Sequence, residues 1–96
     1  MRFSIPHDHP SLAGHFPGRP IVPGVVILDE AVAQILCDRP AHRLVRLDDV
    51  KLLAPVLPGE EVTVACRESA PGQLIFMCEV ASHVVLRGRA RLGAIE

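Results

Sequence analysis

Two titratable residues stand in settings that suit acid–base chemistry. His15 lies in the segment Gly14-His15-Phe16-Pro17-Gly18, where proline restricts the backbone beside the imidazole. Asp29 lies in an apolar run, and its neighbours at helical spacing are all apolar: Val25, Val26, Val32 and Ala33. A carboxylate buried in such a patch without a partner would be costly, so its presence needs an explanation.

Each residue also has a simpler interpretation. A lone histidine is usually structural or exposed. An aspartate early in a helix can be satisfied by backbone donors or by an arginine, and the spacing leaves this alternative to Asp29 open. Glu30, by contrast, shares one polar stripe with Gln34, Cys37 and Asp38, and we expect it to be an ordinary solvated residue.

Together these residues can remove water from a 3-hydroxyacyl thioester. The loop around His15 leads into Pro23-Gly24, where unpaired amides at the start of a helix would stabilise a developing enolate oxygen. The imidazole would take the α-proton, and Asp29, holding a proton or a water, would release the β-hydroxyl. The same groups would catalyse the reverse hydration of a trans-2-enoyl thioester.

The elements that must position these residues follow from the sequence pattern. Residues 1–5 predict a short strand, and the proline-rich segment 6–23 predicts a stiff, irregular loop. The length, the Ala and Leu content and the flanking prolines of segment 25–37 predict a helix, which is apolar almost all round and therefore buried. Beyond Pro40 the hydrophobic period changes to two, which predicts four strands: 42–53, 60–68, 73–82 and 84–93.

One hydrophobic helix among short strands indicates an α+β domain in which a curved antiparallel sheet wraps around the helix. With 96 residues there is room for one domain, residues 1–96. A domain this short buries a smaller share of its surface than a larger one, so an all-apolar helix suggests that a partner subunit completes the core. We therefore expect a homodimer or a higher homo-oligomer.

The composition excludes several classes of partner and site. Ten basic residues against eleven acidic ones give a net charge of −1, which argues against nucleic acid or an anionic membrane as the main partner. With no signal peptide and no long apolar window, we expect a cytoplasmic protein. Cys37, Cys66 and Cys78 are predicted to be reduced thiols. Residues 7–9, His-Asp-His, lack a third ligand at a suitable spacing, so we expect neither a metal nor a cofactor.

Three motifs stand together in this chain: Gly14–Gly18, the Pro20–Gly24 turn, and Asp29 in the helix that follows. In combination, and with a weaker likeness through residues 50–60, they resemble the hotdog-fold 3-hydroxyacyl-acyl carrier protein dehydratases of fatty acid synthesis. The resemblance implies a hotdog fold and a homodimer. It implies that His15 is the general base and faces Asp29 of the other subunit, the general acid. Gly24 would be the backbone oxyanion donor, with Phe16 and Val25 also binding substrate.

The resemblance leaves alternatives open. Asp29 stands where the commoner branch of the family has Glu, and the dehydratase-isomerase branch resembles this chain in using Asp; a shift of one residue would bring Glu30 into line instead. A carrier protein is acidic, so the candidates for docking it or its phosphopantetheine phosphate are Arg19 and Arg43, together with Arg39, Arg46 and the row Arg87, Arg89 and Arg91. The simpler interpretation of an arginine-lined strand face is a solvated surface.

Two other functions use the same fold. A hotdog acyl thioesterase would use the helix carboxylate without requiring His15, and a non-catalytic acyl-binding protein would keep the pocket but show no turnover. The acyl length, the carrier (acyl carrier protein or coenzyme A), isomerase activity and the pathway (fatty acid, polyketide or aryl polyene) are not determined by these motifs.

Overall fold

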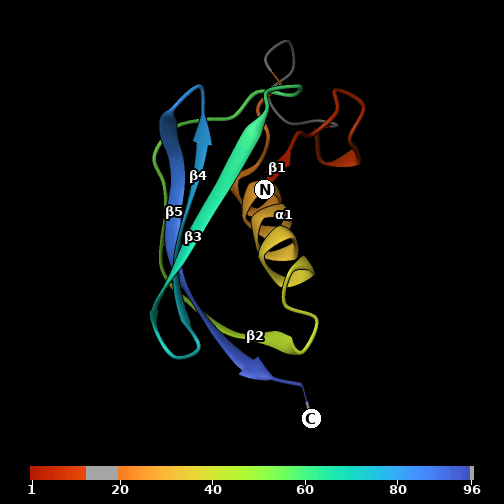
Figure 1. Ribbon diagram of the computed structural model, residues 1–96. Helices are drawn as coiled ribbons and strands as arrows, with labels where there is room; N and C mark the ends of the chain where they lie inside the picture. The colour runs from red at the N-terminus through yellow and green to blue at the C-terminus, as the bar shows by residue number, and fades with distance from the viewer. Residues whose placement is uncertain (13–19, 96) are drawn as a thin grey trace.

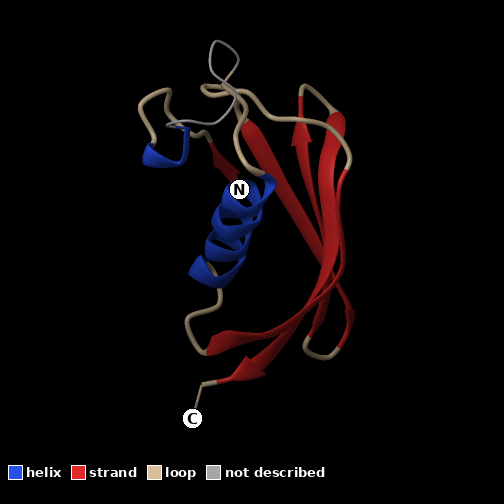
Figure 2. Ribbon diagram, turned by 180° about the vertical axis from the view of Figure 1, so that it is seen from behind, coloured by secondary structure: helices blue, strands red, loops and turns tan. Residues whose placement is uncertain are grey.

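The computed structural model describes residues 1–12 and 20–95. One α-helix lies in the hollow of a curved, five-stranded antiparallel sheet (Figures 1 and 2). The strand order is β1-β3-β4-β5-β2, so that β1 and β2 form the two edges. This confirms the predicted α+β arrangement. The elements in chain order are β1 (Arg2–Phe3), the 3-10 helix η1 (Pro10–Leu12), α1 (Gly24–Cys37), β2 (His42–Leu52), β3 (Val62–Ala70), β4 (Gln73–Val80) and β5 (His83–Ala94).

Helix α1 begins one residue earlier than predicted and ends where predicted. It starts directly after Pro23, whose fixed φ suits the entry to a helix. At its other end, the guanidinium of Arg39 donates to the carbonyl of Ile35 at 3.0 Å, which satisfies an otherwise unpaired carbonyl and places a cation at the negative end of the helix. No helix in the described part of the chain is long and apolar enough to cross a membrane.

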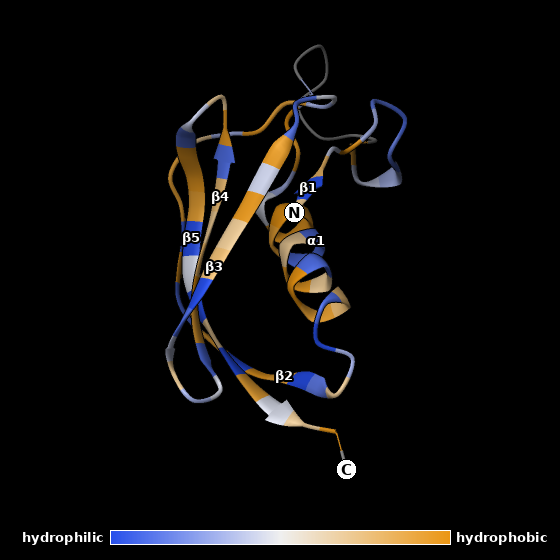
Figure 3. Ribbon diagram, in the orientation of Figure 1, coloured by the Kyte–Doolittle hydropathy of each residue, from blue (hydrophilic) through white to orange (hydrophobic). Residues whose placement is uncertain are grey.

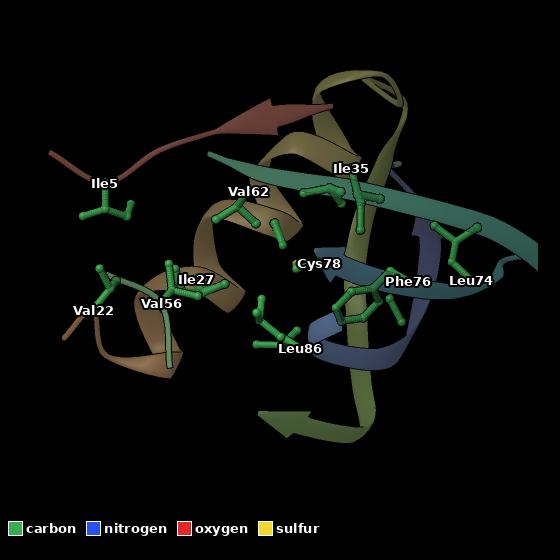
Figure 4. Packing of buried hydrophobic residues seen from close by; sticks show 14 of the residues in the cluster. Ile5, Val22, Ile27, Ile35, Val56, Val62, Leu74, Phe76, Cys78 and Leu86 are labelled. Atoms are coloured by element: carbon green, nitrogen blue, oxygen red, sulfur yellow. The ribbon is translucent and has the colours of Figure 1, made fainter. Parts of the chain in front are cut away.

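The core forms between one face of α1 and the inward side chains of the sheet. Ile27, Ala31 and Ile35, spaced four apart, are almost completely buried. They meet inward residues of β3, β4 and β5, which alternate with outward residues along each strand (Figure 4). The alternation predicted for the last strand is confirmed, since the inward members lie in the interior: Leu86, Gly88, Ala90 and Leu92.

Strand β2 departs from the regular strand that its sequence predicts. Its register against β5 shifts between Leu44 and Arg46 and again between Asp48 and Lys51. Asp49 has a φ of 53°, a left-handed conformation that aspartate tolerates better than most residues. Such bulges increase the bend of a strand, and β2 curves under the end of α1 (Figure 2). The alternation of apolar and polar residues in the sequence does not indicate where such bulges occur.

The turn between β4 and β5 lies one residue earlier than predicted. Val80 pairs with His83, and Ala81 and Ser82 between them both have positive φ, the geometry of a two-residue type I′ hairpin. Neither residue is the Asn or Gly that usually marks this turn, which is why the sequence pattern misplaced it. His42 and His83, which lie next to turns, are exposed.

The cysteines are free thiols, as the sequence predicted. Cys37 is exposed, Cys66 is half-buried and Cys78 is buried. Burial raises the pKa of the Cys78 thiol to about 11. It therefore remains protonated at neutral pH and acts as a small apolar core residue.

Gly88 makes room for the ring of Phe76. A Cβ atom at this position would lie 2.8 Å from Phe76 Cζ and 3.0 Å from Val50 Cγ2. Because Phe76 is fully buried, its ring cannot move aside. Gly88→Ala should therefore lower the free energy of unfolding by about 1–3 kcal/mol, measured by urea denaturation.

Gly93→Ala is the matched control for this prediction. Its Cβ would approach chiefly Val45 Cγ2, at 3.0 Å, and Val45 is 49% exposed and free to rotate away. If Gly93→Ala lowered the free energy of unfolding as much as Gly88→Ala, crowding of the new Cβ atom against the core would not be the cause.

Candidate active site

The start of α1 is held in place by the segment that follows β2. The Val22 amide donates to the Val56 carbonyl at 2.9 Å, and both residues are almost fully buried. Gly24 approaches β2 closely, since a Cβ there would lie 3.1 Å from Leu52 Cδ2. The glycine that was predicted as an oxyanion donor is therefore also the residue that lets the helix start lie against the end of β2.

No side chain of the described residues caps the first turn of α1. The Pro23 carbonyl accepts hydrogen bonds from the amides of Val26, at 3.0 Å, and Ile27, at 3.4 Å. Within the described residues, no acceptor is paired with the amide of Gly24 or Val25. Unpaired amides at a helix start carry partial positive charge, which suits a developing oxyanion.

Asp29 lies on the side of α1 that faces away from the sheet. Helical geometry places it about 200° around the axis from Ile27, which faces the core. Its side chain is exposed in the single chain, and no hydrogen bond or ion pair that joins described residues involves it. The residues one turn before and after, Val25 and Ala33, are also exposed. The apolar surroundings predicted for this carboxylate are present, but one chain alone leaves the carboxylate in solvent.

Glu30 differs from the expectation of an ordinary solvated residue. It is half-buried, and Gln34 Nε2 donates to its Oε1 at 3.3 Å. The reason is the rotation of the helix: residue 30 lies beside the buried line of Ile27 and Ala31, whereas residue 29 lies opposite it. Of the two neighbouring carboxylates, Glu30 already has a partner on its own helix.

Exposed apolar side chains gather where α1 begins and β2 ends. Val25 is 69% exposed, Leu52 49% and Leu53 48%, and the segments that carry them are among the most hydrophobic parts of the ribbon in Figure 3. The contact between Gly24 and Leu52 brings these segments together. We call Val25, Leu52 and Leu53 the apolar rim. Adjacent exposed apolar residues mark an interaction surface, and β2 beside them is an edge strand with one unpaired side.

Three of the predicted site residues lie outside the described residues: His15, Phe16 and Arg19. The pairing of His15 with Asp29 therefore stays a prediction. Arg43 is described and is exposed on β2 opposite Gly93. It lies at the other end of the strand from Leu52, roughly 25–30 Å away by strand rise, so it is remote from the helix start within one chain.

The histidines of residues 7–9 have structural partners. His9 Nδ1 accepts a hydrogen bond from the Ser11 amide at 3.1 Å beside the short helix η1. His7 packs against Gly59, whose Cβ position would lie 2.9 Å from His7 Cε1. In the described parts, residues 1–12 and 20–95, no three His, Cys, Asp or Glu side chains are grouped to hold a metal ion.

The sequence interpretation missed the contribution of β2 to this site. Leu52 and Leu53 were predicted only as the end of a strand, and their exposure next to Gly24 depends on how β2 curves. The available signal was the run of apolar residues Leu52-Leu53-Ala54, which breaks the alternation expected of a strand with one solvated face.

Comparisons with known proteins agree with this arrangement. The sequence model of the ApeI-like family, described as ApeI dehydratase, matches residues 1–89. Among solved structures, the chain is similar to the dehydratase heterocomplex ApeI:P from Xenorhabdus doucetiae, with a TM-score of 0.75 and 20% identity over 95% of this chain and 82% of that one.

Two further structures show the same fold. An uncharacterized protein from Erwinia carotovora subsp. atroseptica has a TM-score of 0.82 and 22% identity, covering 98% of this chain and 81% of that one. An acyl-ACP thioesterase from Bacteroides thetaiotaomicron has a TM-score of 0.74 and 14% identity, covering 97% of this chain and 36% of that one. At these identities the similarities establish the fold, which is the hotdog fold of dehydratases and thioesterases.

Proposed function

We propose that this chain, which belongs to the ApeI-like dehydratase family, removes water from (3R)-3-hydroxyacyl thioesters of an acyl carrier protein. The product is the trans-2-enoyl thioester, formed in fatty acid synthesis or in a related polyketide or aryl polyene pathway. The observation that carries the proposal is Asp29: its carboxylate stands on the exposed, apolar side of α1, beside a helix start whose first amides are uncapped.

In the proposed mechanism, two side chains each transfer one proton and one backbone amide stabilises the developing negative charge. The thioester carbonyl accepts a hydrogen bond from the Gly24 amide, which stabilises the enolate as His15 takes the α-proton. Asp29 gives a proton to the β-hydroxyl, which leaves as water while the α–β double bond forms. His15 then holds the α-proton and Asp29 lacks a proton, so transfer of one proton from His15 to Asp29 through solvent resets the site. Phe16 and Val25 contact the acyl chain.

A second copy of the chain completes this site in the proposal. Val25 of the apolar rim lies one helical turn before Asp29, so a partner seated on the rim and on the free edge of β2 would bury the rim and remove solvent from the carboxylate. Exclusion of water strengthens the electrostatic interactions on which the acid and the oxyanion donor depend. The partner then supplies His15 to face Asp29.

A hotdog thioesterase is the second candidate. The fold similarity to the acyl-ACP thioesterase supports it, and the carboxylate of Asp29 could activate a water for thioester hydrolysis without His15. The products separate the candidates, because hydrolysis releases a free thiol and dehydration does not. A non-catalytic acyl-binding protein would give neither product.

The reaction can be measured as enoyl-thioester absorbance with a 3-hydroxyacyl-acyl carrier protein. His15→Ala should abolish turnover, and Asp29→Asn should lower kcat by about 10²–10⁴-fold, because each variant removes one proton-transfer group. Both should remain dimeric. Glu30→Gln is the matched control and should stay within about threefold of wild type, because Gln34 already engages that carboxylate. A larger loss at Glu30 than at Asp29 would identify Glu30 as the acid.

Mixing two inactive variants tests whether the site is shared between subunits. After subunit exchange, equal amounts of His15→Ala and Asp29→Asn chains should recover about a quarter of wild-type activity, since half of the dimers are mixed and each mixed dimer has one intact site. Exchange can be followed by native mass spectrometry. Mixed dimers that form without recovery of activity would mean that His15 and Asp29 act within one chain.

Charge reversal tests the predicted carrier docking. Arg19→Glu and Arg43→Glu should raise KM for the carrier-bound substrate by about tenfold, with kcat unchanged, because an acidic carrier depends on attraction by these cations. KM for the corresponding pantetheine thioester, which has no acidic protein attached, should stay the same. An unaltered KM for the carrier-bound substrate would reject docking at that arginine.

A further inference from the structure

One face of the sheet is turned away from α1 (Figure 1). The strand register places a group of basic side chains on this outer face. The strand register places the outward side chains of this face in three rows, of which two cross β3, β4, β5 and β2 and the third crosses β4, β5 and β2. We call the side chains of these rows the outer patch: Ala65, Met77, Arg87 and Lys51 in one row, Arg67, Ile75, Arg89 and Asp48 in the next, and Gln73, Arg91 and Arg46 in the third.

Most cations of the outer patch have no acidic partner. Arg46 pairs with Asp48 at 2.9 Å, and Arg89 pairs with Asp49 on the β2 bulge. The remaining cations of the patch form no ion pair with any described residue: Lys51, Arg67, Arg87 and Arg91. Glu79, at the margin of the patch, forms none either. Because the whole chain has a net charge of −1, this positive charge is a local feature and not a property of the surface as a whole.

A groove with an apolar floor runs between these cations. It has a volume of about 520 Å³, and its lining includes Ile75 and Met77 on β4, Val50 on β2, and the stems of Arg87 and Lys51. Met77 is 37% exposed. A flexible, polarizable methionine in an open groove adapts to different apolar groups. A solvated sheet face requires charges but does not require an apolar groove between them.

The combination of groove and charge selects one kind of occupant. An amphipathic protein segment with acidic residues would place its apolar side chains on Ile75 and Met77 and its carboxylates beside Arg87 and Lys51. A second copy of this chain, docked through the same face, would instead bring these unpaired cations against each other. Nucleic acid would be repelled by the carboxylates of Asp48 and Asp49. The described residues of the patch also include no exposed aromatic ring on which a base could stack.

We propose that the outer patch docks an acidic, amphipathic helix of a partner protein. The patch lies on the opposite face of the sheet from α1, so the bound partner leaves Asp29 and the apolar rim free for substrate and for the second subunit. The proposal goes beyond the proposed function and does not depend on it.

The test uses the full chain labelled with ¹⁵N and two designed helical peptides that share one leucine face. One peptide has glutamates on its polar face and the other has lysines. The glutamate peptide should shift the amide signals of Ala65, Met77 and Arg87 and leave those of Val25 and Asp29 unchanged. Its affinity should fall at least about tenfold between low and high salt, because the attraction is between exposed charges. The lysine peptide should bind at least about tenfold more weakly.

Matched variants identify the groups that bind. Met77→Ser, and the pair Lys51→Gln with Arg87→Gln, should each weaken the glutamate peptide by about tenfold or more. His42→Glu lowers the net charge by one unit, as each of those Gln substitutions does, but it does so by adding a carboxylate at the far end of β2, where residue 42 pairs with Ala94; it should leave binding unchanged.

Enoyl-thioester turnover should be the same in Met77→Ser and wild type, so that a failure of this proposal is distinguishable from a failure of the proposed activity. Equal binding of both peptides, or shifts confined to the apolar rim, would overturn the proposal. A change in oligomeric state on Met77→Ser would also overturn it, because a second copy of the chain would then occupy the patch.

Discussion

The packing of one line of α1 against the hollow of the sheet determines the rest of the structure. Ile27, Ala31 and Ile35 are buried together, which sets the rotation of the helix about its axis. Once that rotation is set, residue 29 must point away from the sheet and residue 30 must lie beside the core. The same packing directs the two neighbouring carboxylates to different environments: Asp29 into solvent, and Glu30 into a half-buried position with Gln34 as its partner.

The sheet has a second constraint, because its edge strand must bend to follow the helix. Strand β2 bends through two register shifts and a left-handed residue at Asp49. On the inner side, the bend brings Leu52 against Gly24 and leaves the apolar rim exposed. On the outer side, the same bulge places Asp49 beside Arg89 and forms one wall of the groove that Met77 lines. One irregular strand thus shapes both surfaces for which a partner is proposed.

The chemistry of the proposed site depends on whether Asp29 is surrounded by solvent or by protein. A proton donor and an oxyanion donor are most effective where water is excluded, and a chain of this size does not enclose Asp29 by itself. In the proposed dimer, sharing the site between two copies would resolve this, because the side of α1 that the sheet does not cover would become an interior surface. The proposed arrangement would also make catalysis conditional on assembly, since each subunit would supply one of the two titratable groups.

The sequence by itself determined the class of the fold and the residue types at the site. The apolar run that ends at Cys37 predicts one buried helix, the period-two pattern after Pro40 predicts the strands, and the motif from Gly14 to Gly24 followed by Asp29 predicts a dehydratase, in agreement with the family to which the chain belongs. These features are local, because they depend on the spacing of neighbouring residues.

Only the tertiary structure decided how exposed Asp29 and Glu30 are, where β2 bulges and which leucines form the apolar rim. Asp29 has apolar neighbours in the sequence yet is exposed, because burial depends on which side of the helix meets the sheet. The bulges and the outer groove result from fitting a long strand around a helix that precedes it in the chain. Those contacts join residues far apart in sequence, and no local pattern of residue types encodes them.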